Sequence, residues 1–276
     1  MSHLRRERPG HVYFAGPPLL IAHRGGAKMA PENTMEAFRA AVETWGADIL
    51  ETDARLTRDG RVVLIHDATA DRTCDRSGVI NQMKWSEVNE LDAGYNFRNL
   101  KNQSSFRGRG ARVPLLEEVL ETFPGMRINV EAKCPEVAGP LVTVIRRQNA
   151  ENRVLLAAKI ESDRKQIDSY SGPWGASRRE IARFWATRHL GLLNYFHPTF
   201  DALQVPEFWN GIRVVTPDFV RDAHSFNIPV HVWIVDRAED IRRLLSWGVD
   251  GIQSDRLDVL SSVLKDMVDN KYSHVI

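Results

Sequence analysis

Residues 19–55 read LLIAHRGGAKMAPENTMEAFRAAVETWGADILETDAR and carry the pattern of a strand, a helix and a second strand. The apolar runs that open and close this stretch, Leu19–Arg24 and Ile49–Arg55, have the length of buried parallel strands. Between them, Thr34–Trp45 is expected to form a helix with Asn33 as its N-cap. Two parallel strands joined by a helix form a βαβ unit. The stretch therefore predicts an α/β fold.

The same alternation of apolar runs and longer amphipathic segments continues toward the end of the chain. Further strands are expected at Arg127–Lys133, Val154–Lys159, near Gly175, Ala202–Val205, Pro229–Val235 and Gly251–Ser254, with Arg213–Thr216 as a short addition. Helices are expected at Leu115–Thr122, Glu136–Gln148, Ser162–Tyr170, Arg179–His189, Asp218–Phe226 and Ala238–Trp247, the last bracketed by Asp236 and Gly248. Eight strands with helices between them indicate a TIM-type (β/α)8 barrel, in which functional side chains lie at the C-terminal strand ends.

One region interrupts this rhythm. Residues 67–113 contain no clean strand–helix unit. We interpret them as a small insertion after the second strand that lies over the mouth of the barrel. The length of 276 residues fits a single barrel domain that extends over residues 1–276.

Composition argues against several classes of function. The net charge of +1 gives no global attraction to nucleic acid or to a membrane surface. Cys74 and Cys134 do not suggest a disulfide framework and are compatible with a reducing compartment. The N-terminus lacks an apolar signal segment, and no run approaches the roughly 18 apolar residues of a membrane span. We expect a cytoplasmic protein without stable membrane insertion, and its oligomeric state stays open.

Charged side chains gather on or beside the early strands. Glu51 and Asp53 share one face of a strand, because strand side chains alternate with period two. Their oxygens suit Mg²⁺ or Ca²⁺ better than zinc. His23 and His66, at the ends of neighbouring runs, have the chemistry of a general acid and a general base.

A later strand repeats this pattern. Glu131 lies two residues before Lys133, so these side chains also share a face. Three carboxylates and a lysine at strand ends would hold a cation and a phosphate together. Two further residues have open roles. Arg24 would either bind phosphate or form a buried salt bridge with the carboxylates, and Trp233 would either pack in the core or line an apolar subsite.

The chain resembles the glycerophosphodiester phosphodiesterase family. The resemblance rests on motifs in family order over nearly the whole chain: AHRGG at 22–26, PENT at 31–34, ETD at 51–53, DG at 59–60, HD at 66–67, EAK at 131–133, VHVWIVD at 230–236 and GVDGIQSD at 248–255. It implies a TIM-type barrel with its insertion after His66. The chain departs from the family pattern at LLAAKIES, at WIVD and at Ser254-Asp255, which leaves the head group of the substrate open.

The resemblance also implies a reaction. It makes the chain a phosphoric diester hydrolase that releases glycerol 3-phosphate and an alcohol from a glycerol-3-phosphodiester, a small-molecule substrate. His23 and His66 would be the acid–base pair. One divalent cation, Mg²⁺ or Ca²⁺, would bind Glu51, Asp53 and Glu131. The remaining implied residues would contact the substrate: phosphate at Arg24 and Lys133, and glycerol at Trp233.

Two alternatives remain. A lysophospholipase D would apply the same chemistry to an acylated substrate and needs an apolar groove at the barrel mouth. Two sets of aromatic residues were candidates for this groove: Tyr95, Phe97 and Phe106 in the insertion, or Trp185, Phe208 and Trp209 later in the chain. A non-catalytic barrel that only binds phosphodiesters is the other alternative, because a fold alone does not establish catalysis.

Overall fold

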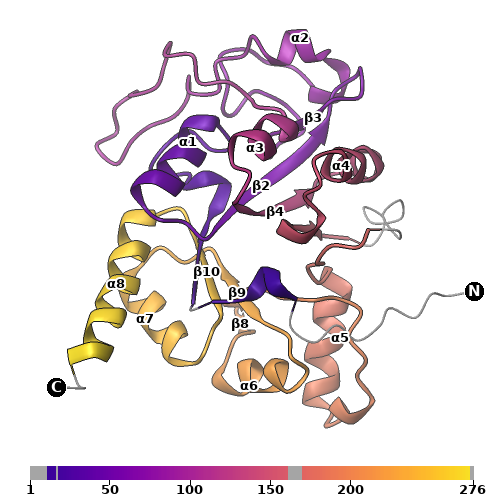
Figure 1. Ribbon diagram of the computed structural model, residues 1–276, viewed down its shortest axis with the longest axis vertical. Helices are drawn as coiled ribbons and strands as arrows, with labels where there is room; N and C mark the ends of the chain where they lie inside the picture. Colours follow the sequence, from indigo (N-terminus) through magenta and orange to yellow (C-terminus); the bar gives the residue numbers. More distant parts are fainter. Residues whose placement is uncertain (1–10, 17, 161–169, 274–276) are drawn as a thin grey trace, which may run out of the picture.

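The protein folds into a TIM-type barrel. The computed structural model describes residues 11–16, 18–160 and 170–273, with side chains through residue 268. Its strands are β1 (Leu19–Ala22), β2 (Ile49–Leu56), β3 (Val62–Leu64), β4 (Arg127–Ala132), β5 (Val154–Ala158), β6 (Leu203–Pro206), β7 (Phe208–Trp209), β8 (Ile212–Arg213), β9 (Val230–Trp233) and β10 (Gly251–Ser254). The barrel strands are parallel and lie in the order β5-β4-β2-β1-β10-β9-β6. Figure 1 shows the early strands in the upper half and the late strands below.

The weak strand expected near Gly175 closes the barrel. Trp174 forms a parallel bridge with Leu156 of β5, and Gly175 forms one with Ala202, next to β6. The two ends of the strand order are therefore joined by a contact of only two residues. This explains the weak sequence signal, because no sustained apolar run is needed to make one bridge on each side.

Helices follow the barrel strands as the sequence predicts. They are α1 (Met35–Arg39), α2 (Trp85–Val88), α3 (Leu116–Thr122), α4 (Pro135–Arg147), α5 (Arg178–His189), α6 (Pro217–Ser225), α7 (Ala238–Ser246) and α8 (Leu257–Ser273). The predicted helix over Ser162–Tyr170 falls almost entirely outside the described residues. Among the described residues, no helix combines the length and apolar character that crossing a bilayer requires.

The N-terminal end of the barrel is closed by an earlier segment. The short 3-10 helix η1 (Val12–Phe14) inserts Tyr13 among interior side chains that include Leu19, Ile21 and Leu155. The Arg127 guanidinium donates a hydrogen bond to the Tyr13 carbonyl oxygen at 3.0 Å and holds the segment there. This segment therefore covers the interior at the N-terminal end of the barrel.

The insertion has a small apolar core of its own. β3 pairs antiparallel with β2, so it belongs to a hairpin rather than to the barrel wall. Buried side chains that include Ile80, Val88 and Leu91 pack together beneath the loops that follow. As Figure 1 shows, these loops lie at the top of the molecule, beside α1 and above β2.

Three sequence predictions about local structure were wrong, and one helix was missed. Thr34, not Asn33, caps α1, because the Thr34 hydroxyl accepts from the Ala37 amide at 3.3 Å. Arg237 occupies the N-cap position of α7, while Asp236 accepts hydrogen bonds from the loop after β10. The extra strand expected at Arg213–Thr216 is replaced by the β7–β8 hairpin. Helix α8 was not predicted, although Leu257, Leu260 and Val263 have helical spacing and are buried.

Candidate active site

A cavity of about 590 Å³ opens at the C-terminal ends of the barrel strands. Its wall contains every residue to which the sequence assigned a chemical role: His23, Arg24, Glu51, Asp53, His66, Glu131, Lys133 and Trp233. These residues lie on or directly after β1, β2, β3, β4 and β9, so the barrel and the β2–β3 hairpin together bring them to one place. The cavity is therefore the candidate active site.

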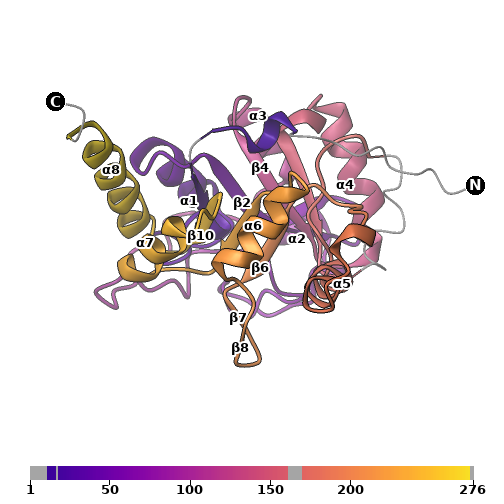
Figure 2. The same cartoon turned by 90° about the horizontal axis from the view of Figure 1, so that it is seen from below.

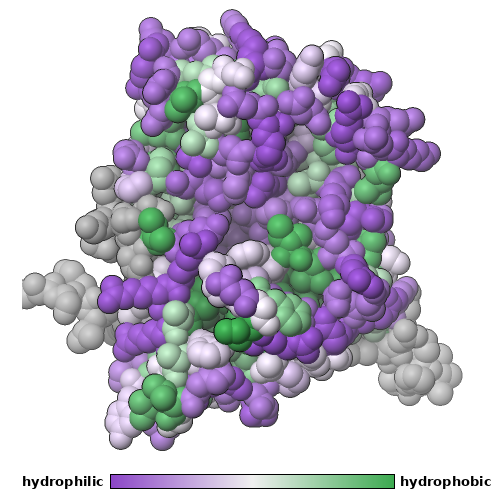
Figure 3. Space-filling view, turned by 180° about the vertical axis from the view of Figure 1, so that it is seen from behind, coloured by the Kyte–Doolittle hydropathy of each residue, from purple (hydrophilic) through white to green (hydrophobic). Residues whose placement is uncertain are grey.

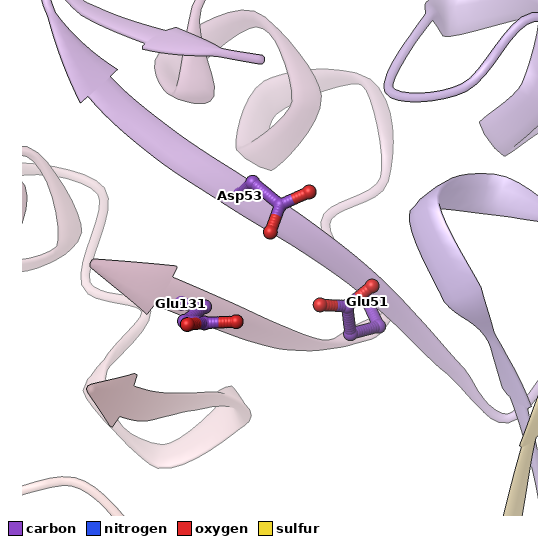
Figure 4. A group of neighbouring side chains, drawn as sticks. All are labelled: Glu51, Asp53 and Glu131. Carbon is purple, nitrogen blue, oxygen red and sulfur yellow. The ribbon is translucent and has the colours of Figure 1, made fainter. Parts of the chain in front are cut away.

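Three carboxylates form its floor. Glu51 and Asp53 project from β2 and Glu131 projects from β4, toward a common space (Figure 4). One oxygen of each lies within 4.8 Å of an oxygen of each of the others. Register explains the placement, because Asp53 lies directly opposite Glu131 on parallel strands. The structure therefore confirms that the three predicted acidic side chains lie close together.

Two cationic side chains neutralise part of this charge. The Lys133 ammonium lies 3.0 Å from Asp53 Oδ1 and 3.0 Å from Glu131 Oε2. Arg24 Nε lies 3.1 Å from Asp53 Oδ2, and its Nη1 donates to Glu32 at 2.9 Å. Of the two roles considered for Arg24, the structure contains the salt bridge with the carboxylates.

Asn33 has a role that the sequence did not suggest. Its backbone lies in the left-handed region at φ 56°, and its amide nitrogen donates to Asp53 Oδ2 at 3.0 Å. Its oxygen accepts from the Thr52 hydroxyl at 2.6 Å. Asn33 therefore fixes Asp53 from the loop before α1 instead of capping that helix.

Burial and neighbouring charges shift the pKa values of the two carboxylates of β2 in opposite directions. Burial and the nearby Asp53 charge raise the pKa of Glu51 to about 7. Burial also disfavours the charged form of Asp53, but Lys133 and Arg24 outweigh it and hold the pKa of Asp53 below its usual value. In the absence of a cation, Asp53 is thus stabilised as a carboxylate while the charge on Glu51 is only partly compensated.

Asp255 orients His23. The Nδ1 atom of His23 lies 2.6 Å from Asp255 Oδ1, and its Nε2 atom lies 4.0 Å from Glu51 Oε2. Burial alone would lower the pKa of His23, yet the bond to Asp255 and the Glu51 charge raise it above its usual value. Asp255 follows β10, the last strand, which pairs with β1. Barrel closure therefore provides the partner of His23.

His66 is held by a chain of ion pairs. Its Nδ1 atom lies 2.6 Å from Asp67 Oδ1, and Arg72 Nε donates to Asp67 Oδ2 at 2.5 Å. Arg72 also donates to both oxygens of Glu32, which pairs with Arg24. Burial is the main cause that lowers the pKa of His66. The insertion and the loop after β1 are thus linked through one charged network.

The cavity has two chemically different halves. Most of the charged residues come from the segments around β1 to β4, whereas the later segments supply mostly apolar side chains together with Lys159 and Arg178. The apolar half contains Ala157, Ala158, Ala176, Ile181, Ala182, Trp185, Pro206, Trp209, Ile212, Val214, Trp233 and Ile234. Of the two aromatic sets considered for a groove, the later one supplies Trp185 and Trp209. Phe208 and the aromatic residues of the insertion do not line the cavity.

The residues that fit a divalent cation are oxygen donors. Besides the three carboxylates, Asn129 contributes a buried Oδ1 atom to the cavity that has no hydrogen-bond partner among the described residues. Asn129 lies opposite Glu51 in the strand register. An orphaned buried acceptor beside hard oxygen ligands matches the chemistry of Mg²⁺ or Ca²⁺.

Comparison with known proteins identifies the family. The model of the glycerophosphoryl diester phosphodiesterase family matches residues 23–259. The chain belongs to this family. It is therefore an enzyme of the phosphoric diester hydrolase class.

Two family relatives match over most of their lengths. A probable glycerophosphodiester phosphodiesterase 2 from Mycobacterium tuberculosis is 33% identical and aligns over 90% of this chain and 91% of its own. A glycerophosphodiester phosphodiesterase from Caldanaerobacter subterraneus subsp. tengcongensis is 32% identical, with 90% and 98% covered.

A solved structure supports the fold. An Oleispira antarctica phosphodiesterase in complex with the product sn-glycerol-3-phosphate superimposes with a TM-score of 0.72 at 22% identity. The match covers 90% of this chain and 97% of that one. At 22% identity, this likeness establishes the fold alone: the chain has the same barrel architecture as the solved structure.

Four residues that build the site were given no role in the site from the sequence: Glu32, Asn33, Arg72 and Asp255. Glu32, Asn33 and Asp255 lie inside the family motifs PENT and GVDGIQSD. Their place inside these motifs is the sequence signal that could have identified the three residues as part of the site. Arg72 lies outside them, and only the structure shows its link to Glu32 and Asp67.

Proposed function

We propose that the chain hydrolyses glycerol-3-phosphodiesters to glycerol 3-phosphate and an alcohol, with one divalent cation and with His23 and His66 as the acid–base pair. One observation carries this proposal: two imidazoles, three carboxylates and two cationic side chains line a single cavity. The family to which the chain belongs, and the named product in the Oleispira antarctica structure, support the choice of substrate.

Glu51, Asp53 and Glu131 would hold the cation. When bound, Mg²⁺ or Ca²⁺ supplies Lewis-acid neutralisation of charge on phosphoryl oxygens. The cation would also offset the cost of keeping Glu51 charged, which burial and Asp53 impose. Turnover with Mg²⁺, compared with turnover with Ca²⁺, shows which of the two ions the enzyme uses.

The protein's own groups would carry the proton transfers. One histidine takes the proton from the attacking hydroxyl group, either of water or of the glycerol, and the other protonates the leaving alcohol. Asp255 and Asp67 each hold one ring through Nδ1, so the Nε2 atom of each ring is left for the reaction. Lys133 would stabilise negative charge that grows on the phosphate in the transition state.

Trp233 would contact the glycerol. It lies at the end of β9 and lines the apolar half of the cavity. An indole face offers an apolar wall to the carbon side of a small polyol. This role and that of Arg24 in phosphate binding are expectations for the bound state.

The test measures glycerol 3-phosphate release from glycerophosphocholine and from glycerophosphoglycerol, with Mg²⁺, Ca²⁺ or chelator. We expect turnover that requires a cation and falls by about 10²- to 10⁴-fold in His23→Ala and in His66→Ala. His197→Ala, at an exposed position away from the cavity, serves as the matched control. Turnover that persists in both active-site variants would refute the acid–base roles.

The apolar half of the cavity favours a second candidate, lysophospholipase D activity. An acyl chain on the glycerol would lie along Ile181, Trp185 and Ile212. Release of choline from lysophosphatidylcholine tests it. We expect Trp185→Ala to lower kcat/KM for this substrate and to leave hydrolysis of glycerophosphocholine nearly unchanged. An equal loss on both substrates would contradict an acyl subsite.

Two further features of the enzyme concern the boundaries of its catalytic domain and the compartment in which it works. We propose that residues 1–276 act as one catalytic domain with an insertion at about 67–113, and that the enzyme works in the cytoplasm. Activity of the isolated chain and fractionation of cells that express it check the two statements.

A further inference from the structure

A short hairpin beside the cavity exposes large apolar side chains. β7 and β8 pair through Trp209 and Ile212, and Asn210 and Gly211 form the tight turn between them with positive φ angles of 48° and 79°. Phe208 is 48% exposed, Trp209 44% and Ile212 55%. Figure 2 shows the hairpin projecting from the body of the barrel. Its side chains therefore cannot be explained as ordinary core packing.

The exposed apolar surface is continuous with the cavity. Trp209 and Ile212 of the hairpin line the cavity, and so does Ile234, which is itself 44% exposed. Figure 3, which views the molecule from behind, shows hydrophobic side chains gathered below the central hollow, whereas its upper side is mostly hydrophilic. An exposed apolar patch of this kind marks an interaction site.

Cationic groups flank the aromatic rings. The Arg178 guanidinium lies 5.1 Å from the centre of the Trp209 ring, and the Arg213 guanidinium lies 4.8 Å from the centre of the Phe208 ring. Lys159 lines the same cavity as Arg178. Arg213 also lies 3.6 Å from Glu207 Oε1. Within the described part of the chain, by contrast, neither Lys159 nor Arg178 has an acidic partner. Aromatic and aliphatic side chains beside unpaired cations are typical of segments that bind anionic membrane surfaces.

This charge also decides between two occupants of the patch. A second copy of the chain, paired symmetrically through the hairpin, would bring the Lys159 and Arg178 cations of both chains to one interface. Like charges would then oppose the contact. An anionic lipid surface satisfies the cations and the apolar side chains at the same time.

We propose that the β7–β8 hairpin docks the enzyme on anionic lipid bilayers, with Phe208, Trp209 and Ile212 in the boundary between head groups and acyl chains. The docking is peripheral and reversible, because only a few side chains reach the bilayer. It places the apolar half of the cavity next to the surface, so lipid-derived phosphodiesters would reach the site along Ile212 and Ile234. Docking does not depend on the reaction proposed above, and the binding measurement that tests it uses no substrate.

The test is co-sedimentation of the full chain with vesicles. One set contains phosphatidylcholine alone and the other also contains phosphatidylglycerol. We expect binding to the anionic vesicles that weakens with salt. Phe208→Ser should lower the partition coefficient by about five- to tenfold, since it removes one half-exposed aromatic side chain from the boundary. Phe208→Trp should retain binding.

Phe208 suits this purpose because it does not line the cavity. Hydrolysis of dispersed glycerophosphoglycerol should therefore be the same in Phe208→Ser as in the wild type, which also shows that the variant is folded. Val12→Ser is the matched control, since Val12 is 71% exposed at the opposite end of the barrel. Absent binding by the wild type, or equal loss in Val12→Ser, would overturn the proposal. So would a dimer that Phe208→Ser dissociates, without vesicle binding.

Discussion

The Nδ1 atom of His23 lies 2.6 Å from a carboxylate oxygen of Asp255, although 232 positions separate the two residues in the chain. His23 follows the first strand of the barrel and Asp255 follows the last, and these two strands are paired. The contact therefore exists only once the barrel has closed. It makes the orientation of a proposed catalytic ring depend on the completeness of the fold.

Replacing Asp255 tests the orientation of His23. In Asp255→Asn the side chain keeps its size but loses the charge that fixes the ring and stabilises its protonated form. We expect kcat to fall by about 10²-fold, the lower end of what a general acid or base contributes. Steady-state kinetics measure the effect. Asp258→Asn, which removes a nearby carboxylate in the first turn of α8 that pairs with Arg256, should leave kcat within about twofold of the wild-type value.

Replacing Glu51 tests the cation site through stability. Without a cation, burial and Asp53 disfavour the charged form of Glu51. Glu51→Gln should therefore raise the free energy of unfolding by about 1–3 kcal/mol in chelator at pH 8, and should abolish stabilisation by Mg²⁺ or Ca²⁺. Urea unfolding with and without the cation measures both. The exposed Glu43→Gln is the control, and a Glu51→Gln protein that is less stable in chelator would contradict the prediction.

Buried His231 should give the protein a pH-dependent stability. Burial lowers the pKa of His231 to about 4, against 6.5 for the ordinary imidazole. Between these values the unfolded chain binds more protons than the folded one, so stability falls as the pH falls from 6.5 to 4. The loss amounts to on the order of 3 kcal/mol. Thermal unfolding across this range measures it.

A variant isolates this contribution. In His231→Leu the part of the pH dependence that comes from this ring should disappear, whatever the change in absolute stability. The His231 ring packs against Phe14, with ring centres 5.7 Å apart. Because leucine has a different shape, we also expect a lower melting temperature at neutral pH. An unchanged slope of stability against pH would show that another group titrates.

Replacing Arg72 tests the network that holds His66. Arg72 is the group that joins Asp67 to Glu32, and its loss frees Asp67 to turn away from the ring. We expect Arg72→Gln to lower kcat by about tenfold with little change in melting temperature, because the side chain is half exposed. Arg76→Gln, which removes nearby ion pairs with Asp75 and Glu90, is the control and should have little effect on kcat.

The sequence predicted the barrel strands because each, apart from the weak one near Gly175, has a short apolar run of its own. It predicted the carboxylate cluster because alternation along β2 and β4 is a local property. It missed helix α8, whose apolar spacing is nonetheless present, and it exchanged the roles of Asn33 and Thr34. That error has a physical origin: both residue types can cap a helix, and only the nearby Asp53 draws the Asn33 amide into the barrel.

What the sequence determined by itself is the set of chemical groups and the strand faces that carry them. Period-two alternation places Glu51 beside Asp53 and Glu131 beside Lys133, whatever the rest of the chain does. The tertiary structure decided which groups meet. Asp255 reaches His23, and Arg72 reaches Glu32, through contacts between segments that lie far apart in the chain. Such contacts follow from barrel closure and loop packing, which no local pattern of residues encodes.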